Sequence, residues 1–282
     1  MPGRWPDGAL GVSRSGSSAW PGRSPSARAR ADERLTERIR AIYQTGRGTY
    51  GSPRRHVERR TVGERCGRRR VARLMREAGL RGCQGRRRHS RTTTHDRQAV
   101  PAPARVQRAF APPTIGAPDR LWVADSSYVA TGEGWLYLAV VLEAFRRRGV
   151  GWATADHLRT ELGLDALTIA LCHRQPNAGL IHHADHGCQY TSLAFSQWLH
   201  EAGILASMDT VGDCLDKAVA ESFLATLKVE LLPRHVGATR AVARLAIFEF
   251  MELWYNRQRR HSTLGYATPT EYEALVQAVA IA

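Results

Sequence analysis

The stretch LWVADSSYVATGEGWLYLAVVLE, residues 121–143, has the pattern of two β-strands joined by a tight turn. Its first part, LWVADSSYV (121–129), is strand-like, and TGEG (131–134) supplies the turn. WLYLAVVLEAF (135–145) is a long apolar run typical of a buried strand. A third strand is expected near Gly149–Trp152, so the stretch predicts an antiparallel unit that begins a sheet.

Helical and strand-like segments alternate beyond this unit. They are TELGLDALTIALCHR (160–174), GLIHH (179–183), TSLAFSQWLHEAG (191–203), ILASM (204–208) and DKAVAESFLATLKVELL (216–232). In the first helix Leu164, Leu167, Thr168 and Leu171 are expected to face the core. The order βββαβαβα predicts an α/β fold in which helices flank a mixed sheet.

The front of the chain has a different composition. Residues 1–30 are rich in Ser, Gly, Pro and Arg, which predicts a flexible basic leader. Residues 31–80 predict a small helical module, with one helix starting behind a cap at Asp32 and a basic helix in GRRRVARLMREAGL. Residues 81–117 form a basic linker, and residues 118–282 form the core domain with its C-terminal helices.

The net positive charge of the chain comes from this front part. Residues 1–120 contain 28 Arg and 9 Asp or Glu residues, a net charge of +19, whereas residues 121–282 carry −4. A biased codon pool explains 39 Arg against 2 Lys, but it does not explain why the charge lies on one side of residue 120. A polyanion is therefore the expected partner, with DNA or RNA as the leading candidate.

The apolar and cysteine patterns exclude several classes of protein. No apolar run reaches the length of a membrane span, and MPGRWPDGAL lacks the apolar core of a signal peptide. Five scattered cysteines without a CxxC pair argue against a disulfide framework or a structural zinc finger. A cytoplasmic protein that makes no membrane contact is expected.

Two basic segments are expected to contact DNA. In the helix within residues 67–80, Val71, Leu74 and Met75 share one face, while arginines cover the rest. The arginines proposed as contacts there are Arg68, Arg69, Arg70 and Arg73. Near the C-terminus a long helix (about Thr239–Asn256) and a final one from Pro269 are separated by RQRRHSTLGY, which contains Arg257, Arg259 and Arg260.

Three carboxylates are expected to converge at one end of the sheet. Asp125 lies within the first strand, Asp185 follows GLIHH, and Glu221 lies on the following helix, about 200° around the helix from Val219. Lys228, two turns later, shares the face of Glu221 and suits a phosphate contact. Three carboxylates without soft ligands favour Mg²⁺ or Mn²⁺, and a pair of such ions supports phosphodiester chemistry.

For the segment HHADHGCQY (182–190), a zinc site and a nucleophilic pair are the alternatives to a role of Asp185 as a ligand of a hard metal ion. A zinc site requires ligands within tetrahedral reach, but His182 and His183 are adjacent on a strand and point to opposite faces. A nucleophilic pair of Cys188 and His186 has no supporting pattern elsewhere. We favour Asp185 as a metal ligand, with one histidine in the core, the other near DNA or ligand, and Gln189 and Tyr190 facing the DNA.

These motifs together resemble a known family. LWVADSSYV, GWLYLAVVLEAF, GLIHHADHGCQYTS, GDCLDKAVAESFLATLKVELL and YNRQRRHSTLGYATPTEY are similar to the second-frame protein of insertion-sequence transposases of the IS-three group, relatives of retroviral integrases. RGTYGSPR and GRRRVARLMREAGL resemble the helix-turn-helix segment that precedes the core in that group. The resemblance implies a ribonuclease-H-like integrase core, a homo-oligomer bound to element ends and target DNA, and association with the bacterial nucleoid. It also implies two Mg²⁺ ions held by Asp125, Asp185 and Glu221, which are separated by the Asp-Asp-(35)-Glu spacing.

Several residues depart from the pattern of that group. The group usually has Thr at Ala124, Asp at Glu143, Ser at Arg146 and a leucine at Arg59. Beside the acids it usually has Arg at His186 and Asn at Lys217, so less favourable surroundings predict a weak enzyme. The alternative to an active transposase is a decayed copy that acts only as a DNA-binding protein or as an inhibitor of its own element.

Overall fold

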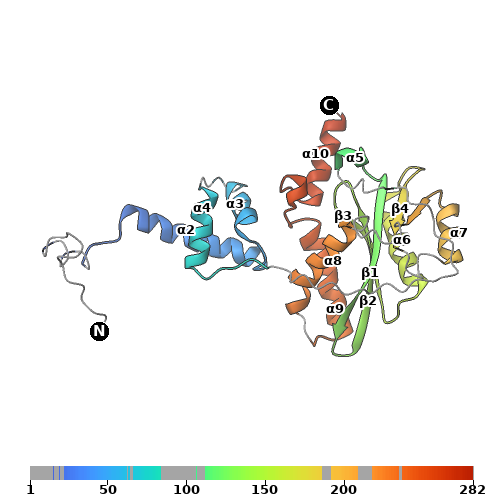
Figure 1. The fold of residues 1–282 in the computed structure, drawn as a ribbon, viewed down its shortest axis with the longest axis horizontal. Helices are drawn as coiled ribbons and strands as arrows, with labels where there is room; N and C mark the ends of the chain where they lie inside the picture. The colour runs from blue at the N-terminus through green and yellow to red at the C-terminus, as the bar shows by residue number, and fades with distance from the viewer. Residues whose placement is uncertain are drawn as a thin grey trace. The chain divides into compact units, whose positions relative to one another are not determined.

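The computed structural model of the chain describes residues 15, 19, 22–61, 63, 66–83, 106, 112–185, 192–208, 218–234 and 237–281. The chain divides into two compact units, Met1–Gly82 and Cys83–Ala282. Each unit has its own apolar core, and its helices and strands are drawn in Figure 1. The division lies two residues beyond the expected end of the helical module.

The first unit includes three helices that the structure describes over their whole length. They are α2 (Ala27–Thr45), α3 (Ser52–Thr61) and α4 (Arg68–Glu77). Leu35 and Ile39 of α2 pack against an apolar stripe of α4 formed by Val71, Leu74 and Met75. The amphipathic pattern predicted for the basic helix is therefore confirmed, because its apolar side is buried and arginines occupy the remaining surface.

The start of α2 corrects one prediction. The helix begins at Ala27, behind a Ser26 cap whose side chain accepts a hydrogen bond from the Ala29 N–H at 3.1 Å. Asp32 lies inside the helix, where its carboxylate accepts hydrogen bonds from Arg70 and Arg73 of α4. These arginine hydrogen bonds lower the pKa of Asp32. Because Ala and Arg are good helix formers, the ARARA run joins the helix and the cap moves upstream.

The second unit contains a mixed sheet of five strands. They are β1 (Leu121–Thr131), β2 (Gly134–Glu143), β3 (Arg148–Ala155), β4 (Ile181–Ala184) and β5 (Leu205–Met208), in the spatial order β3-β2-β1-β4-β5. The first three strands pair antiparallel, and β4 pairs parallel with both β1 and β5. The register between β1 and β2 runs without interruption from Trp122–Glu143 to Thr131–Gly134, whereas β3 contains a bulge opposite Val141 and Leu142.

Helices cover both faces of this sheet (Figure 1). Helices α6 (Thr160–Arg174) and α7 (Leu193–Glu201) lie on one side, and α8 (Ala218–Glu230) and α9 (Arg240–Phe248) lie on the other. The remaining helical segments are α5 (Pro112–Ile115), η3 (Leu232–Arg234), η4 (Glu249–Tyr255), η5 (Ser262–Leu264) and α10 (Pro269–Ile281). The expected order βββαβαβα and the α/β fold class are confirmed.

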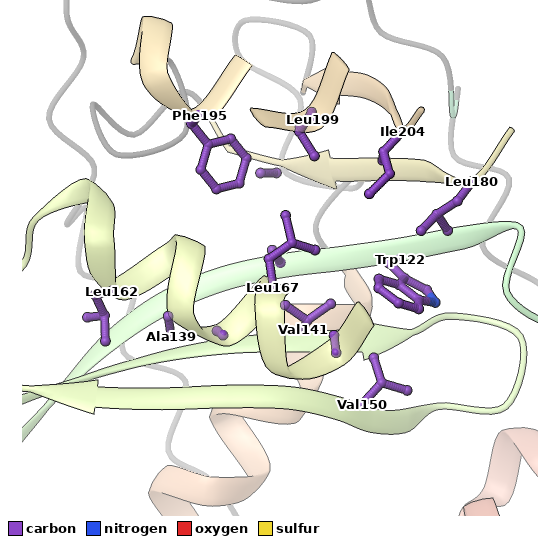
Figure 2. Packing of buried hydrophobic residues seen from close by; sticks show 14 of the residues in the cluster. Trp122, Ala139, Val141, Val150, Leu162, Leu167, Leu180, Phe195, Leu199 and Ile204 are labelled. Atoms are coloured by element: carbon purple, nitrogen blue, oxygen red, sulfur yellow. The ribbon is translucent and has the colours of Figure 1, made fainter. Parts of the chain in front are cut away.

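One face of the sheet and the helices above it form the main apolar core (Figure 2). Trp122 and Val141 project from β1 and β2 towards Leu167 of α6, and Phe195 and Leu199 of α7 close the core over β4. Trp122 has no exposed surface, and its indole N–H donates to Asp119 at 3.1 Å. Burying apolar side chains from both layers fixes which face each strand residue occupies.

Helix α6 packs against the sheet partly through small residues, which the leucine pattern did not indicate. A Cβ on Gly151 of β3 would lie 2.1 Å from the Ala166 carbonyl oxygen, so only glycine fits there. The buried face of α6 is formed by Leu162, Gly163, Ala166, Leu167 and Ala170. Thr168 is exposed, and the prediction that it faces inward was wrong, because small residues bring the helix backbone against the strand.

A largely buried ion-pair network joins four segments of this unit that are distant in the sequence. Arg146, on the turn after β2, binds Glu273 of α10 at 2.8 Å and lies 3.5 Å from Asp119. Arg174, the last residue of α6, binds both acids at 2.6 Å, and Arg148 also contacts Glu273. Burial acts to raise the pKa of Glu273, but the three arginines outweigh it and hold that pKa low. The charged network therefore ties α10 to the sheet.

Glu143 ends β2 with a buried carboxylate that organises the following turn. Its two oxygens accept hydrogen bonds from the backbone N–H groups of Phe145 and Arg146, at 2.9 and 2.8 Å. Burial raises the pKa of Glu143 to about 7, although these hydrogen bonds and the Arg146 charge act to lower it. The buried Glu143 carboxylate thus stabilises the turn that follows β2.

We expect Glu143 to make the second unit less stable as the pH rises. The unfolded carboxyl titrates near 4.5 and the folded one near 7, so the folded state holds the extra proton between these values. Its contribution is complete below pH 4.5 and is lost as the pH rises through 7, an effect of about 2–3 kcal/mol. Urea unfolding of wild type and Glu143→Gln from pH 5 to 8 measures it. A stability difference that does not change with pH would contradict the prediction.

Candidate active site

Asp125 lies in the middle of β1 and faces away from the main core. Trp122 and Ala124 project into the core under α6 and α7, so alternation along the strand places Asp125 on the opposite face, which α8 covers. One carboxylate oxygen of Asp125 accepts a hydrogen bond from the Ser126 N–H at 2.7 Å. This contact limits the orientation of the carboxylate.

Asp185 follows the last residue of β4 and is buried, with 9% of its surface exposed. The parallel register pairs Leu121 with Ile181 and Val123 with His183. The recorded pairing ends at Val123 and His183; with the same offset of sixty residues, Asp185 would lie beside Asp125 on the same face of the sheet. The convergence of the two acids stays a prediction that this register favours.

Glu221 lies in the first turn of α8. Val219, Phe223 and Leu227 of this helix are buried, whereas Glu221 and Lys228 are exposed, as the helical spacing predicted. Because α8 packs over β1, Glu221 belongs to the same side of the sheet as Asp125.

The described residues contain no group of three His, Cys, Asp or Glu side chains close enough to hold one metal ion. The three acids thus share a side of the sheet without forming a closed ligand set. Carboxylates repel one another unless cations lie between them, and Glu221 is exposed to solvent. All three supply hard oxygen donors without a soft ligand, so their chemistry fits Mg²⁺ or Mn²⁺.

The two histidines before Asp185 are both buried. The His182 ring packs against Phe195 with centroids 5.4 Å apart, and burial lowers the pKa of His182 to about 3. The Nδ1 atom of His183 lies 3.0 Å from the Ser207 hydroxyl of β5. The expectation that one histidine packs in the core holds for His182, but His183 is engaged inside the sheet. Its cross-strand contact to β5 explains why it does not reach the surface.

Some predicted site residues lie outside the described part of the chain. They are Gln189 and Tyr190, proposed to face DNA, together with His186, Cys188 and Lys217. The proposed roles of these five residues remain predictions.

The C-terminal arginines differ in their surroundings. Arg257 is exposed, and Arg260 binds Glu271 at 2.5 Å. Arg259 has 6% of its surface exposed and pairs with the buried Glu230 at 2.9 Å. The predicted DNA contact of Arg259 is therefore replaced by an internal ion pair, which neutralises Glu230 at the end of α8.

The arginines of α4 also divide into two groups. Arg68 and Arg69 are exposed, whereas Arg70 and Arg73 are partly exposed and bind Asp32 of α2. Arg68 and Arg69 are therefore the more accessible cations of this helix, and Arg70 and Arg73 also hold two helices together.

Arg55 of α3 was not singled out from the sequence, although it is fully buried. Its guanidinium lies 4.0 Å from the centroid of the Tyr43 ring, and its nitrogens have no hydrogen-bond partner among the described residues. Burial lowers the pKa of Arg55 to about 10. Arg55 and Arg59 are both buried four residues apart on α3, and this spacing was the available signal.

Comparison with known families agrees with this arrangement. A family described as an integrase core domain matches residues 116–214, and a second family of the same description matches residues 202–269. A family described as an HTH-like domain matches residues 30–89, which include the three helices α2, α3 and α4 almost completely.

Similar proteins cover nearly the whole chain. The uncharacterized 31 kDa protein of insertion element IS600 from Shigella sonnei is 41% identical over 263 residues, which cover 93% of this chain and 95% of that protein. Transposase InsF for insertion sequence IS3A from Escherichia coli strain K12 is 32% identical, and the match covers 94% of this chain and 91% of InsF. Among solved structures, an intasome of simian T-cell lymphotropic virus in complex with PP2A regulatory subunit B56 gamma matches with a TM-score of 0.47 and 15% identity, over 63% of this chain and 60% of that chain.

Proposed function

We propose that Asp125, Asp185 and Glu221 form the catalytic centre of this chain. The premise is that the chain belongs to the insertion-sequence transposases of the IS-three group. The chain is a transposase of the Asp-Asp-Glu type, a polynucleotidyl transferase with an integrase core domain. The observation that supports the assignment of the acids is the parallel register of β1 and β4, because its offset of sixty residues equals the separation of Asp125 and Asp185. The 35-residue spacing then leads to Glu221 on the helix that packs over β1.

The three acids are proposed to hold a pair of Mg²⁺ ions, for which Mn²⁺ can substitute. When bound, such a pair activates a water or hydroxyl as nucleophile and stabilises the leaving oxygen of a phosphodiester. Asp185 contributes from a buried position, where electrostatic interactions are stronger than in solvent. Asp125 is oriented by the Ser126 N–H, and Lys228, on the face of Glu221, binds a phosphate of the DNA strand.

The first unit is proposed to hold duplex DNA. Its exposed cations include Arg68 and Arg69 at the start of α4, the helix expected to enter a groove. Arg257 and Arg260 are proposed as further backbone contacts from the second unit. Two element ends and a target are joined in one reaction, so the active complex is proposed to be a homo-oligomer in the cytoplasm, associated with the nucleoid. No helix in the described part of the chain is long and apolar enough to cross a membrane.

A cleavage assay tests the proposed function. The full chain is incubated with a labelled duplex that carries the end of the element encoding it, in Mg²⁺, in Mn²⁺, or in EDTA. Strand cleavage and joining are expected with either metal and are expected to stop in EDTA. DNA binding without cleavage under all metal conditions would instead support the inactive DNA-binding copy.

The charge division predicts where non-specific affinity resides. A fragment of residues 1–120 is expected to bind duplex DNA with an affinity that falls steeply with salt, because its charge of +19 displaces condensed counterions. A fragment of residues 121–282, with a charge of −4, is expected to bind far more weakly. Gel-shift titrations of both fragments at several salt concentrations measure this difference. Equal affinities would contradict the assignment of DNA binding to the first unit.

A further inference from the structure

Two aromatic side chains are exposed together near the tip of the β1–β2 hairpin. Tyr128 and Trp135 have 37% and 49% of their surfaces exposed, and their rings meet edge to face with centroids 4.8 Å apart. The register pairs Tyr128 with Tyr137 and Ala130 with Trp135, so the two rings are diagonal neighbours on one face of the hairpin. Aromatic rings exposed to this extent offer flat apolar surface to a ligand.

Two cations flank this aromatic pair. The Lys228 ammonium, on α8, lies 5.7 Å from the centroid of the Tyr128 ring. The Arg240 guanidinium, at the start of α9, donates to the Trp135 carbonyl oxygen at 3.2 Å. The neighbouring carboxylate of Glu133 is engaged, because it accepts a hydrogen bond from the Arg240 backbone N–H at 2.9 Å. The surface therefore combines stacking area with positive charge.

The hairpin tip is held in place by the segment that precedes α9. The Gly132 N–H donates to the Ala238 carbonyl oxygen at 2.8 Å. A Cβ on Gly132 would lie 2.8 Å from the Gly237 carbonyl oxygen, so the two backbones are in close contact. A binding surface on such a tip is preorganised and loses little conformational entropy when a ligand binds.

The aromatic pair is connected to the proposed catalytic acids through β1 and α8. Tyr128 is three residues beyond Asp125 on β1, a rise of about 10 Å, and its side chain leaves the strand on the opposite face. Lys228 is seven residues beyond Glu221 on α8, again a rise of about 10 Å. Lys228, which lies beside the Tyr128 ring, thus links the aromatic pair to the helix of Glu221, at a distance of about three nucleotides of stacked strand.

We propose that Tyr128, Trp135 and Lys228, here called the stacking platform, bind an unpaired nucleobase of the DNA strand near the reacting phosphate. An unpaired base stacks on an aromatic ring irrespective of its identity, and adjacent cations hold the flanking phosphates. The proposal rests on the proposed function, because it places the base a few nucleotides from the acids. The flanking cations favour DNA as the occupant over an apolar surface of a second copy.

A binding assay without divalent cations tests the stacking platform separately from the catalytic acids. The full chain in EDTA is titrated with two duplexes of equal length, one blunt and one with a short single-stranded tail containing 2-aminopurine. Wild type is expected to prefer the tailed duplex by about tenfold, because stacking of one base contributes on this scale. Trp135→Ala and Tyr128→Ala are expected to abolish that preference and the change in 2-aminopurine fluorescence, whereas Tyr128→Phe retains both.

The ratio of the two affinities cancels the contribution of the basic first unit, which is common to both duplexes. Phe248→Ala is the control, because Phe248 is another aromatic residue with 47% of its surface exposed in the same unit. The proposal is overturned if wild type does not discriminate between the duplexes, or if Trp135→Ala leaves the ratio unchanged. If Trp135→Ala changes the oligomeric mass measured by sedimentation but not the ratio of affinities, the surface is a contact between copies of this chain and the proposal is overturned. Because EDTA prevents cleavage, an error in the catalytic assignment would not alter these outcomes.

Discussion

Asp125→Asn, Asp185→Asn and Glu221→Gln are each expected to reduce strand cleavage and joining by at least about a hundredfold to a thousandfold, the cost of removing one charge-stabilising group from a catalytic centre. Each substitution keeps the shape of the side chain but removes the charge that holds a cation. Since no two of the acids form a complete ligand set, the loss of any one of them is expected to be severe. Single-turnover cleavage of a labelled element end, at saturating Mg²⁺, measures the effect.

DNA binding is expected to be nearly unchanged in all three variants, because the basic first unit supplies most of the affinity. Glu201→Gln is a suitable control, since Glu201 is an exposed acid at the end of α7 that accepts a hydrogen bond from Gln197 on the same helix. Its cleavage rate is expected to equal that of wild type. Substantial cleavage by any one of the three variants would refute the assignment of that acid.

Glu273→Gln is expected to destabilise the second unit by about 3 kcal/mol, because it removes one of the two carboxylates that neutralise the buried Arg146 and leaves only Asp119. Glu273 is contacted by Arg146, Arg148 and Arg174, and both Arg146 and Glu273 are almost completely buried. An amide can still accept a hydrogen bond but does not neutralise the guanidinium groups. The free energy of unfolding in urea at neutral pH measures the loss.

Glu271→Gln provides a matched control on the same helix. The Glu271 side chain is 48% exposed and pairs with Arg260 near the surface. Solvent screens such pairs, so its substitution is expected to cost less than about 1 kcal/mol. Similar losses for the two variants would mean that burial of the Arg146 network does not determine its contribution.

The elements of the second unit were predictable because their signals are local. Two strand-like runs are separated by the turn residues TGEG along 121–143, and the helix of Glu221 has buried residues at four-residue steps. The parallel pairing of β1 with β4, on which the predicted meeting of Asp125 and Asp185 depends, followed from topology, since parallel strands bring their carboxyl ends to one edge of a sheet. These predictions required no knowledge of distant contacts.

The errors arose where distant contacts determine the outcome. Arginine is usually found at the surface, but Arg259 is buried because it pairs with Glu230, which lies 29 positions earlier in the sequence. Thr168 was placed inward because the pattern of leucines concealed a face of small residues, and Gly151 on another element determines that face. The role of Asp32 depends on two arginines about forty residues away. A single sequence does not specify such partners.

The pairing of β1 also restricts how the length of this chain can change during evolution. Asp125 and Tyr128 occupy opposite faces of one strand, and the register with β2 is continuous across all ten pairs. One inserted or deleted residue between them would turn one of these side chains to the wrong face. The bulge between β2 and β3 shows that the outer strand accommodates an additional residue, Val150, without breaking the sheet. Insertions and deletions in descendants of this gene should therefore accumulate at β3 and in the loops, and be purged from the β1–β2 hairpin.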